Sequence, residues 1–162
     1  LVDHVRQDLR ETGIQASRLI IEITESAFVS GGDVEMYSLK SLNALGVGIE
    51  IDDFGTGYSS ISYLRRLPVQ TVKVDRSLIR DISADPGQRQ FVDAVHGLIR
   101  AAGMEAVFEG IETLDQAADL LVLGCRNGQG YYFSRPLAAG QIQAILAADT
   151  VLPLVQAPVA AN

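Results

Sequence analysis

A polar side chain occurs at or near the end of each predicted strand, although buried strands are otherwise apolar. In chain order these residues are Glu22, Asp52 with Asp53, Lys73, Glu109 and Gln129. They recur once per predicted strand-and-helix unit. Side chains that recur in this way meet at one place only when the strands surround a common axis, as at the carboxyl end of a (β/α) barrel. The spacing therefore predicts one site that combines carboxylates, an ammonium group and an amide.

Three of these residues could bind a metal ion. Glu22, Asp52 and Asp53 offer hard oxygen ligands, which suit Mg²⁺ or Mn²⁺ better than a soft metal. Two such ions can hold the attacking and the leaving oxygens of a phosphodiester. A single carboxylate at a strand end more often caps a helix or faces solvent. The metal hypothesis therefore depends on the whole set of polar residues, each at the same place in its strand-and-helix unit.

The elements that must position these residues alternate between strands and helices. We predict strands at 18–24, 47–52, 70–74 and 104–108, with a fifth on or near 129–133. Helices are predicted at 33–45, 88–102, 114–123 and 138–147, after a first helix that ends at Gly13. This alternation is typical of βα units around a parallel sheet. A doubly wound sheet is the alternative, but it would gather its ligand contacts at one switch point, so we predict an α/β fold, a TIM-like (β/α) barrel.

Apolar periodicity predicts which faces of these elements are buried. The 3.6-residue period places Val34, Tyr37 and Phe91 on the inner faces of their helices. A complete barrel takes about 250 residues, so the 162 residues present should form an incomplete barrel of about five βα units. Strand residues that should face the barrel interior would then be uncovered, and we expect them to include Ile21, Ile23, Ile49 and Val72.

Composition and charge exclude several classes of protein. Hydrophobic residues make up 48% of the chain, which is enough for one domain with a core and excludes a disordered tail. The net charge of −7 is the wrong sign for a surface that binds long nucleic acid. No apolar run approaches the roughly 18 residues of a membrane span, so no membrane contact is expected. Cys125 is the single cysteine, which excludes an intramolecular disulfide and makes a cytoplasmic location the default.

Five motifs together resemble the EAL-domain family. They are IEITES (21–26), DDFGTGYSS (52–60), KVDRS (73–77), FEGIET (108–113) and GCRNGQGYYFSRP (124–136). The family is similar throughout to bacterial phosphodiesterases that hydrolyse the second messenger cyclic-di-GMP to linear pGpG with two divalent cations. The resemblance implies that 1–148 is the C-terminal part of an EAL domain and that 149–162 is a tail or linker.

The resemblance also implies a metal site with Mg²⁺ or Mn²⁺ as the cofactor. By this likeness Glu22 and Asp52 ligate metal, and Asp53 contacts the second ion. Glu109 matches the family's further acidic ligand or candidate base. These residues are the same carboxylates that the spacing brings together.

Other roles follow from the same resemblance. Lys73 would lie beside the attacking water or the phosphate, and Gln129 would order water at the metals. Glu25 matches the glutamate that holds the DFGTGYSS loop. Asp75 and Pro136 would contact the substrate, although Asp75 could instead serve the loop or cap the following helix.

The chain also departs from the family pattern. The tripeptide Glu-Ala-Leu and the Asn-containing strand motif that follows it occur nowhere in the sequence, and both supply metal ligands in the family. We therefore expect this chain to be a piece of a longer one. Glu50 stands where a small or apolar residue is usual, Phe108 replaces Ala, and Arg126 replaces Asp. Phe108, next to a predicted ligand, should narrow the pocket.

Two other functions remain open at this stage. The chain could be a receptor that binds cyclic-di-GMP without cleaving it, or an interaction module that associates through exposed sheet edges. An incomplete barrel should either form a homo-oligomer or be completed by an upstream segment. Without the upstream ligands, the chain alone is expected to be inactive.

Overall fold

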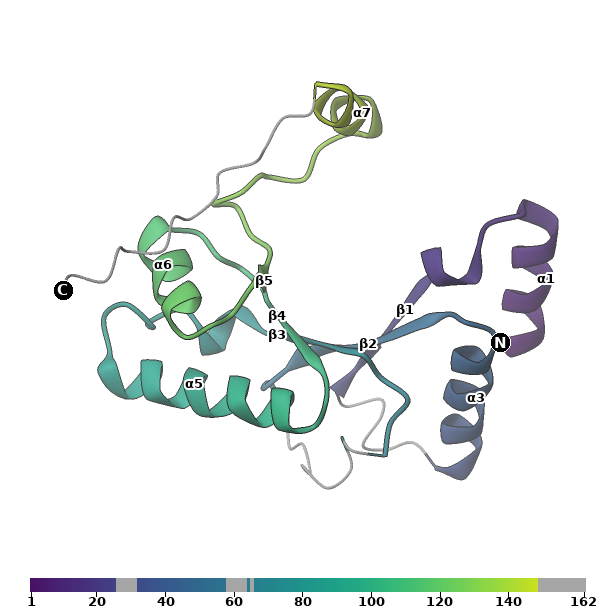
Figure 1. The fold of residues 1–162 in the computed structure, drawn as a ribbon, viewed down its shortest axis with the longest axis horizontal. Helices are drawn as coiled ribbons and strands as arrows, with labels where there is room; N and C mark the ends of the chain where they lie inside the picture. The colour runs from purple at the N-terminus through teal and green to yellow at the C-terminus, as the bar shows by residue number, and fades with distance from the viewer. Residues whose placement is uncertain (26–31, 58–63, 65, 149–162) are drawn as a thin grey trace. The chain divides into compact units, whose positions relative to one another are not determined.

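The structure is a computed structural model and describes residues 1–25, 32–57, 64 and 66–148 (Figure 1). The chain divides into two compact units. The first contains Leu1–Asp75 and Gly97–Ala106, and the second contains Arg76–His96 and Val107–Asn162. The predicted tail at 149–162 lies outside the described residues.

Three parallel strands form the sheet of the first unit. They are β1 (Ile20–Thr24), β2 (Gly48–Phe54) and β3 (Thr71–Val74). Strand β1 pairs with β2 so that Glu22 is opposite Glu50 and Thr24 is opposite Asp52, and β2 pairs with β3 so that Glu50 is opposite Thr71. This register brings the polar residues of the three strands to neighbouring positions.

One face of this sheet is buried and the other is polar. Ile49, Ile51, Val72 and Val74 are all fully buried. The intervening positions carry Glu22, Glu50, Asp52, Thr71 and Lys73, which are half-buried or exposed. The expectation that Ile49 and Val72 face an uncovered barrel interior is therefore wrong. Ile21 and Ile23 are half-buried, on the same side as Ile49 and Ile51 by the β1–β2 register. Side chains alternate between the two faces of a strand. The prediction placed the apolar side chains on the face toward the barrel interior, whereas they lie on the buried face.

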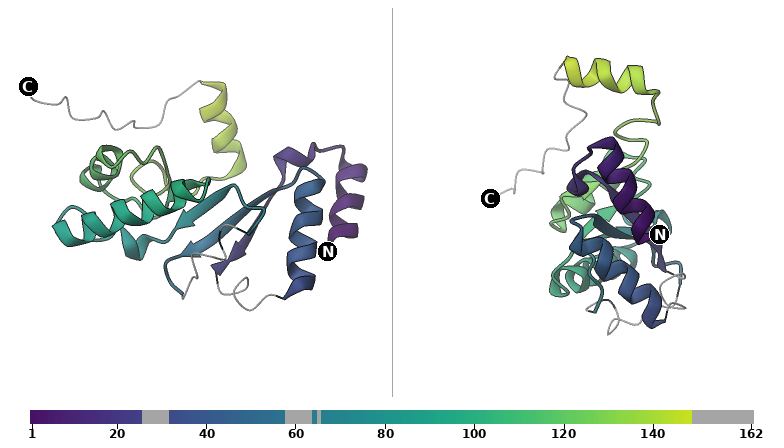
Figure 2. Two further views of the ribbon diagram at one scale, coloured as in Figure 1. Left: turned by 60° about the horizontal axis from the view of Figure 1, so that its bottom comes forward. Right: turned by 90° about the vertical axis from the view of Figure 1, so that its right-hand side faces the viewer.

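Within the described residues, two complete helices belong to the first unit together with its sheet. They are α1 (Val2–Thr12) and α3 (Asp33–Ala44), which lie side by side in Figure 2. Helix α1 ends where Gly13 takes a left-handed conformation with φ of 68°, as the sequence predicts. A single turn of 3-10 helix, η1 (Ala16–Arg18), leads into β1. Leu42 is the buried residue of α3, whereas Val34 and Tyr37 are exposed, contrary to prediction.

The second unit contains the end of β4 (Glu105–Phe108) and β5 (Asn127–Gly128). Its helices are α5 (Pro86–Ala101), whose last residues belong to the first unit, α6 (Leu114–Val122) and α7 (Ala139–Ala147), and it has one 3-10 turn, η2 (Arg76–Leu78). An ion pair of 2.9 Å between Arg89 and Asp119 joins α5 to α6, which are neighbours in Figure 1. Phe91 of α5 is half exposed rather than buried as predicted.

The strand order of the sheet is β1-β2-β3-β4-β5. The pairs β1/β2, β2/β3 and β4/β5 are parallel, which confirms the predicted α/β class. Strand β5 is shorter than expected and lies just before Gln129 instead of including it. The carboxyl ends of the strands carry the predicted site residues.

Candidate active site

Lys73 lies between two predicted metal ligands. Its Nζ is 2.9 Å from Oε1 of Glu22 on β1 and 2.9 Å from Oδ1 of Asp52 on β2. The lysine side chain is 12% exposed, and those of Glu22 and Asp52 are 46% and 24% exposed. Two carboxylates from different strands therefore converge on one point beside a largely buried ammonium group.

The charge of these strands is strongly negative. Strands β1, β2 and β3 together carry four carboxylates, from Glu22, Glu50, Asp52 and Asp53, and one ammonium group, from Lys73. One positive minus four negative charges leaves −3. Clustered charge of one sign attracts counter-ions of the other sign. The strand ends therefore favour a divalent cation, and their carboxylate oxygens are the ligands that Mg²⁺ and Mn²⁺ prefer.

An irregularity in β2 exposes two consecutive aspartates. Along a regular strand Asp53 would share the buried face of Ile51, but the register with β3 shifts between Ile51 and Phe54. Asp53 has φ of 54° and is exposed, and Phe54 takes the buried position instead. A left-handed conformation costs about 1–2 kcal/mol for most residues, and Asp tolerates it better than most. The irregularity therefore places Asp52 and Asp53 together on the accessible side of β2, which is a common use of such features near functional sites.

Glu25, directly after β1, contacts the glycine-rich loop. Its side chain is buried, with 2% exposure, and Oε2 accepts a 2.9 Å hydrogen bond from the amide of Gly55. A Cβ at Gly57 would lie 3.1 Å from Oε1, so the glycine leaves room for the carboxylate. Among the described residues, Oε1 has no hydrogen-bond partner. This geometry fits the predicted role of Glu25 in holding the loop, which stays a prediction.

Glu109 and Gln129 meet in the second unit. The Gln129 side-chain amide donates to Oε1 of Glu109. The backbone N–H of Gln129 donates to the Phe108 carbonyl at 2.9 Å, and its carbonyl accepts from Ile111 at 3.1 Å. Backbone pairing thus continues beyond β5 and holds the amide beside the carboxylate.

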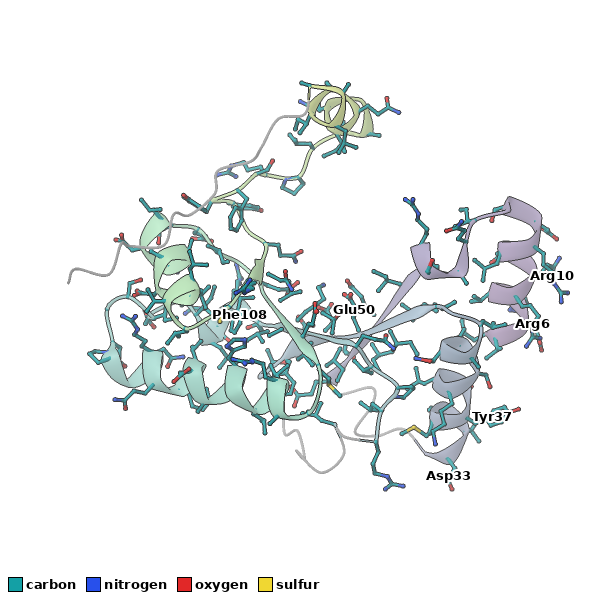
Figure 3. The ribbon with its side chains drawn as sticks, in the orientation of Figure 1. Arg6, Arg10, Asp33, Tyr37, Glu50 and Phe108 are labelled. Carbon is teal, nitrogen blue, oxygen red and sulfur yellow. The ribbon has the colours of Figure 1, made fainter. Side chains whose placement is uncertain are left out.

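Phe108 does not narrow a pocket beside Glu109. Its side chain, labelled in Figure 3, is completely buried. Its ring contacts that of His96 on α5. Successive strand residues point to opposite faces, so Phe108 fills the core. The expected narrowing is therefore wrong. Glu50, also labelled in Figure 3, is half-buried on β2, two residues before Asp52.

The two predicted substrate contacts, Asp75 and Pro136, follow β3 and β5 along the chain. Asp75 follows β3, and its backbone N–H donates to the Phe54 carbonyl at 3.1 Å. Pro136 is exposed in the segment between β5 and α7. Their roles toward substrate stay predictions.

The sequence analysis missed Gly130 as a residue on which the site depends. Tyr132 donates its backbone N–H to the Ile111 carbonyl at 2.9 Å, which draws the segment after Gln129 against Ile111. A Cβ at Gly130 would collide with the backbone of Ile111. The signal was available in the Gly-Gln-Gly sequence, where the second glycine follows a candidate site residue.

Gly130→Ala is expected to lower the free energy of unfolding by about 3 kcal/mol, because the clash is with backbone that cannot rotate away. Urea unfolding of the two chains measures the difference. The control is Gly97→Ala in α5, where nothing lies within 4 Å of the added Cβ; it should be neutral or stabilise the chain by up to about 1 kcal/mol. Equal stability of Gly130→Ala and the unsubstituted chain would contradict the close approach.

A parallel α/β sheet with carboxylates and a lysine at the carboxyl ends of its strands is the arrangement of (β/α)-barrel active sites. The EAL domain model matches residues 1–136. The chain belongs to the EAL domain family, and the family fold confirms the predicted TIM-like class.

Among curated relatives, the chain is similar to the bifunctional diguanylate cyclase/cyclic di-GMP phosphodiesterase MucR of Pseudomonas aeruginosa. The two are 43% identical over 147 residues, which are 91% of this chain and 22% of MucR. The solved MucR phosphodiesterase in complex with c-di-GMP has a TM-score of 0.82, and the match covers 88% of this chain and 57% of that one. The chain therefore spans little more than half of that solved phosphodiesterase.

Two further solved structures extend the comparison. The EAL domain of Mycobacterium smegmatis DcpA has a TM-score of 0.84 at 39% identity, covering 93% of this chain and 67% of that one. A manganese and c-di-GMP complex of BlrP1 from Klebsiella pneumoniae has a TM-score of 0.77 at 36% identity, covering 83% and 34%. Relatives of the chain thus bind the dinucleotide, and at least one of their crystals also contains manganese.

In the part of the chain that the structure describes, no helix combines the length and the apolar character that crossing a membrane requires.

Proposed function

We propose that this chain carries the C-terminal part of a metal-dependent phosphodiesterase domain that hydrolyses cyclic-di-GMP to linear pGpG. The observation that carries the proposal is the convergence of Glu22 and Asp52 on Lys73, each at 2.9 Å. The names of MucR and its relatives support the reaction class. In this proposal residues 1–148 belong to the domain and 149–162 form a tail or linker, and the domain acts in the cytoplasm.

The carboxylates present fit a pair of divalent cations. Glu22, Asp52, Asp53 and Glu109 would hold Mg²⁺ or Mn²⁺, because two of them already converge from separate strands and all supply hard oxygen donors. When bound, the ions would act as Lewis acids on the phosphodiester.

The side chains of the protein would supply charge, proton transfer and substrate contacts in the reaction. Hydrolysis joins a water oxygen to phosphorus and breaks the bond to one ribose oxygen, which leaves with a proton. Lys73 would keep a positive charge beside the phosphate as negative charge develops there. Glu109 would accept a proton from water, and Gln129, which donates to Glu109, would fix the direction of its carboxylate. Glu25 would hold the loop at Gly55, and Asp75 and Pro136 would contact the dinucleotide.

The proposal predicts that catalysis needs the family's Glu-Ala-Leu segment, which does not occur in these 162 residues. We expect the 162-residue chain to release linear product at no measurable rate. A longer chain, extended at Leu1 by a segment that carries Glu-Ala-Leu, should turn over cyclic-di-GMP in the presence of Mn²⁺. Chromatography of the nucleotides, with size-exclusion chromatography of both chains, makes the comparison. Equal turnover by a monomer of the short chain would contradict the need for completion.

A further inference from the structure

We propose that His96 and Phe108 form a positioning pair that fixes the carboxyl end of β4 and with it the Glu109–Gln129 hydrogen bond. The proposal deepens the proposed function, and its catalytic part depends on that function. All the residues involved belong to the second unit.

The pair is buried and has a defined geometry. Phe108 is fully buried and His96 is 6% exposed. Their ring centroids are 5.9 Å apart and the ring planes cross at 74°. This edge-to-face arrangement is favourable for aromatic rings beyond the area that it buries. It fixes the Phe108 side chain against α5.

His96 is itself held from a second direction. Its Nδ1 lies 3.3 Å from the carbonyl oxygen of Leu123, the C-cap residue directly after α6. A carbonyl oxygen can only accept, so Nδ1 must carry the hydrogen of this bond. The last carbonyls of a helix have no partner within the helix, and the imidazole supplies one. His96 therefore connects α5, the end of α6 and β4.

Backbone bonds carry this restraint to the site. The carbonyl of Phe108 accepts a 2.9 Å hydrogen bond from the backbone N–H of Gln129. In the β4–β5 register Phe108 is opposite Gly128, the residue before Gln129. The side-chain amide of Gln129 then donates to Glu109, the residue after Phe108. A rotation of the peptide between Phe108 and Glu109 would change both bonds at once. The position of the Phe108 ring therefore affects the distance and the direction of the amide–carboxylate contact.

The test separates positioning from ordinary core packing. The variants are Phe108→Leu and His96→Leu, which remove one ring each, and the double variant. The control is Ile82→Val, a truncation at a residue of the same unit that is 1% exposed. Urea unfolding shows how far each variant is destabilised. NMR records the side-chain amide signals of Gln129, which are assigned by their loss in Gln129→Ala, and calorimetry records Mn²⁺ binding.

Both single variants should move the Gln129 side-chain amide signals, and the double variant should move them by less than the sum of the two shifts. Ile82→Val should leave them in place even at equal loss of stability. Affinity for Mn²⁺ should fall about tenfold in the ring variants, as when the support of a ligand is removed. The positioning role of the pair would be refuted if the Gln129 side-chain amide signals did not move in Phe108→Leu, or if they moved as far in Ile82→Val. If the unsubstituted chain binds no Mn²⁺, the proposed function fails. The positioning role of His96 and Phe108 is then tested by the Gln129 side-chain amide signals, which are recorded without metal.

Discussion

Lys73→Met is expected to lower kcat about 10²–10³-fold in a chain that includes the upstream segment, while KM changes little. The Nζ of Lys73 lies 2.9 Å from both Glu22 and Asp52, so a fixed positive charge stands beside the carboxylates that would hold the metal ions, and through them the phosphate. Met keeps an unbranched apolar stem as far as Cε and removes the ammonium group, with its charge and its hydrogen bond to Asp52. Initial rates over a range of cyclic-di-GMP concentrations separate kcat from KM.

The control for this variant is Lys40→Met on α3, at an exposed position, which removes the same charge and should leave both constants unchanged. Binding of Mn²⁺ should persist in Lys73→Met, because all the carboxylates are retained. A Lys73→Met variant with kcat near that of the unsubstituted chain would assign Lys73 a purely structural role.

Asp52→Asn with Asp53→Asn should abolish the binding of Mn²⁺. The irregularity of β2 exposes both carboxylates on one strand, and the two substitutions remove two of the four negative charges of β1–β3 with almost no change of shape. Binding by the chain as given should be weak, because part of the family's ligand set lies outside it. Calorimetry with Mn²⁺ at low ionic strength measures the change.

A matched pair of substitutions controls for net charge. Asp8→Asn with Asp33→Asn alters two exposed aspartates of α1 and α3 and changes the net charge by the same amount. This control should bind Mn²⁺ as the unsubstituted chain does. Equal binding by the Asp52/Asp53 variant would remove the metal assignment.

The sequence predicted the order and type of the elements better than the faces that they bury. The strands at Ile20–Thr24, Gly48–Phe54 and Thr71–Val74 begin and end within about two residues of their predicted limits. Apolar alternation does not say which of two faces is covered by helices, because both faces of a parallel sheet can be buried. Ile49 and Val72 were assigned to the wrong face for that reason.

Those site residues that lie within long sequence motifs were predictable from the sequence. The parts of the site that depend on contacts between residues far apart in the sequence were less so. The convergence of Glu22 and Asp52 on Lys73 followed from their recurrence at strand ends. The conformation of Asp53, with φ of 54°, and the contact of Gly130 with Ile111 depend on strand register, which the sequence does not state. Phe108 was expected beside the site because it adjoins Glu109, but alternation along β4 turns its ring toward His96.

The fate of cyclic-di-GMP bound to the longer chain tests the central claim most directly. The dinucleotide would be incubated with that chain and Mn²⁺, with a parallel sample in excess chelator, and the nucleotides identified by mass spectrometry over time. The account predicts that linear pGpG accumulates with Mn²⁺, that it does not form with chelator, and that neither sample is altered by adding the Lys40→Met change. Recovery of intact cyclic-di-GMP from a saturated, manganese-loaded chain would contradict the account and identify the domain as a receptor.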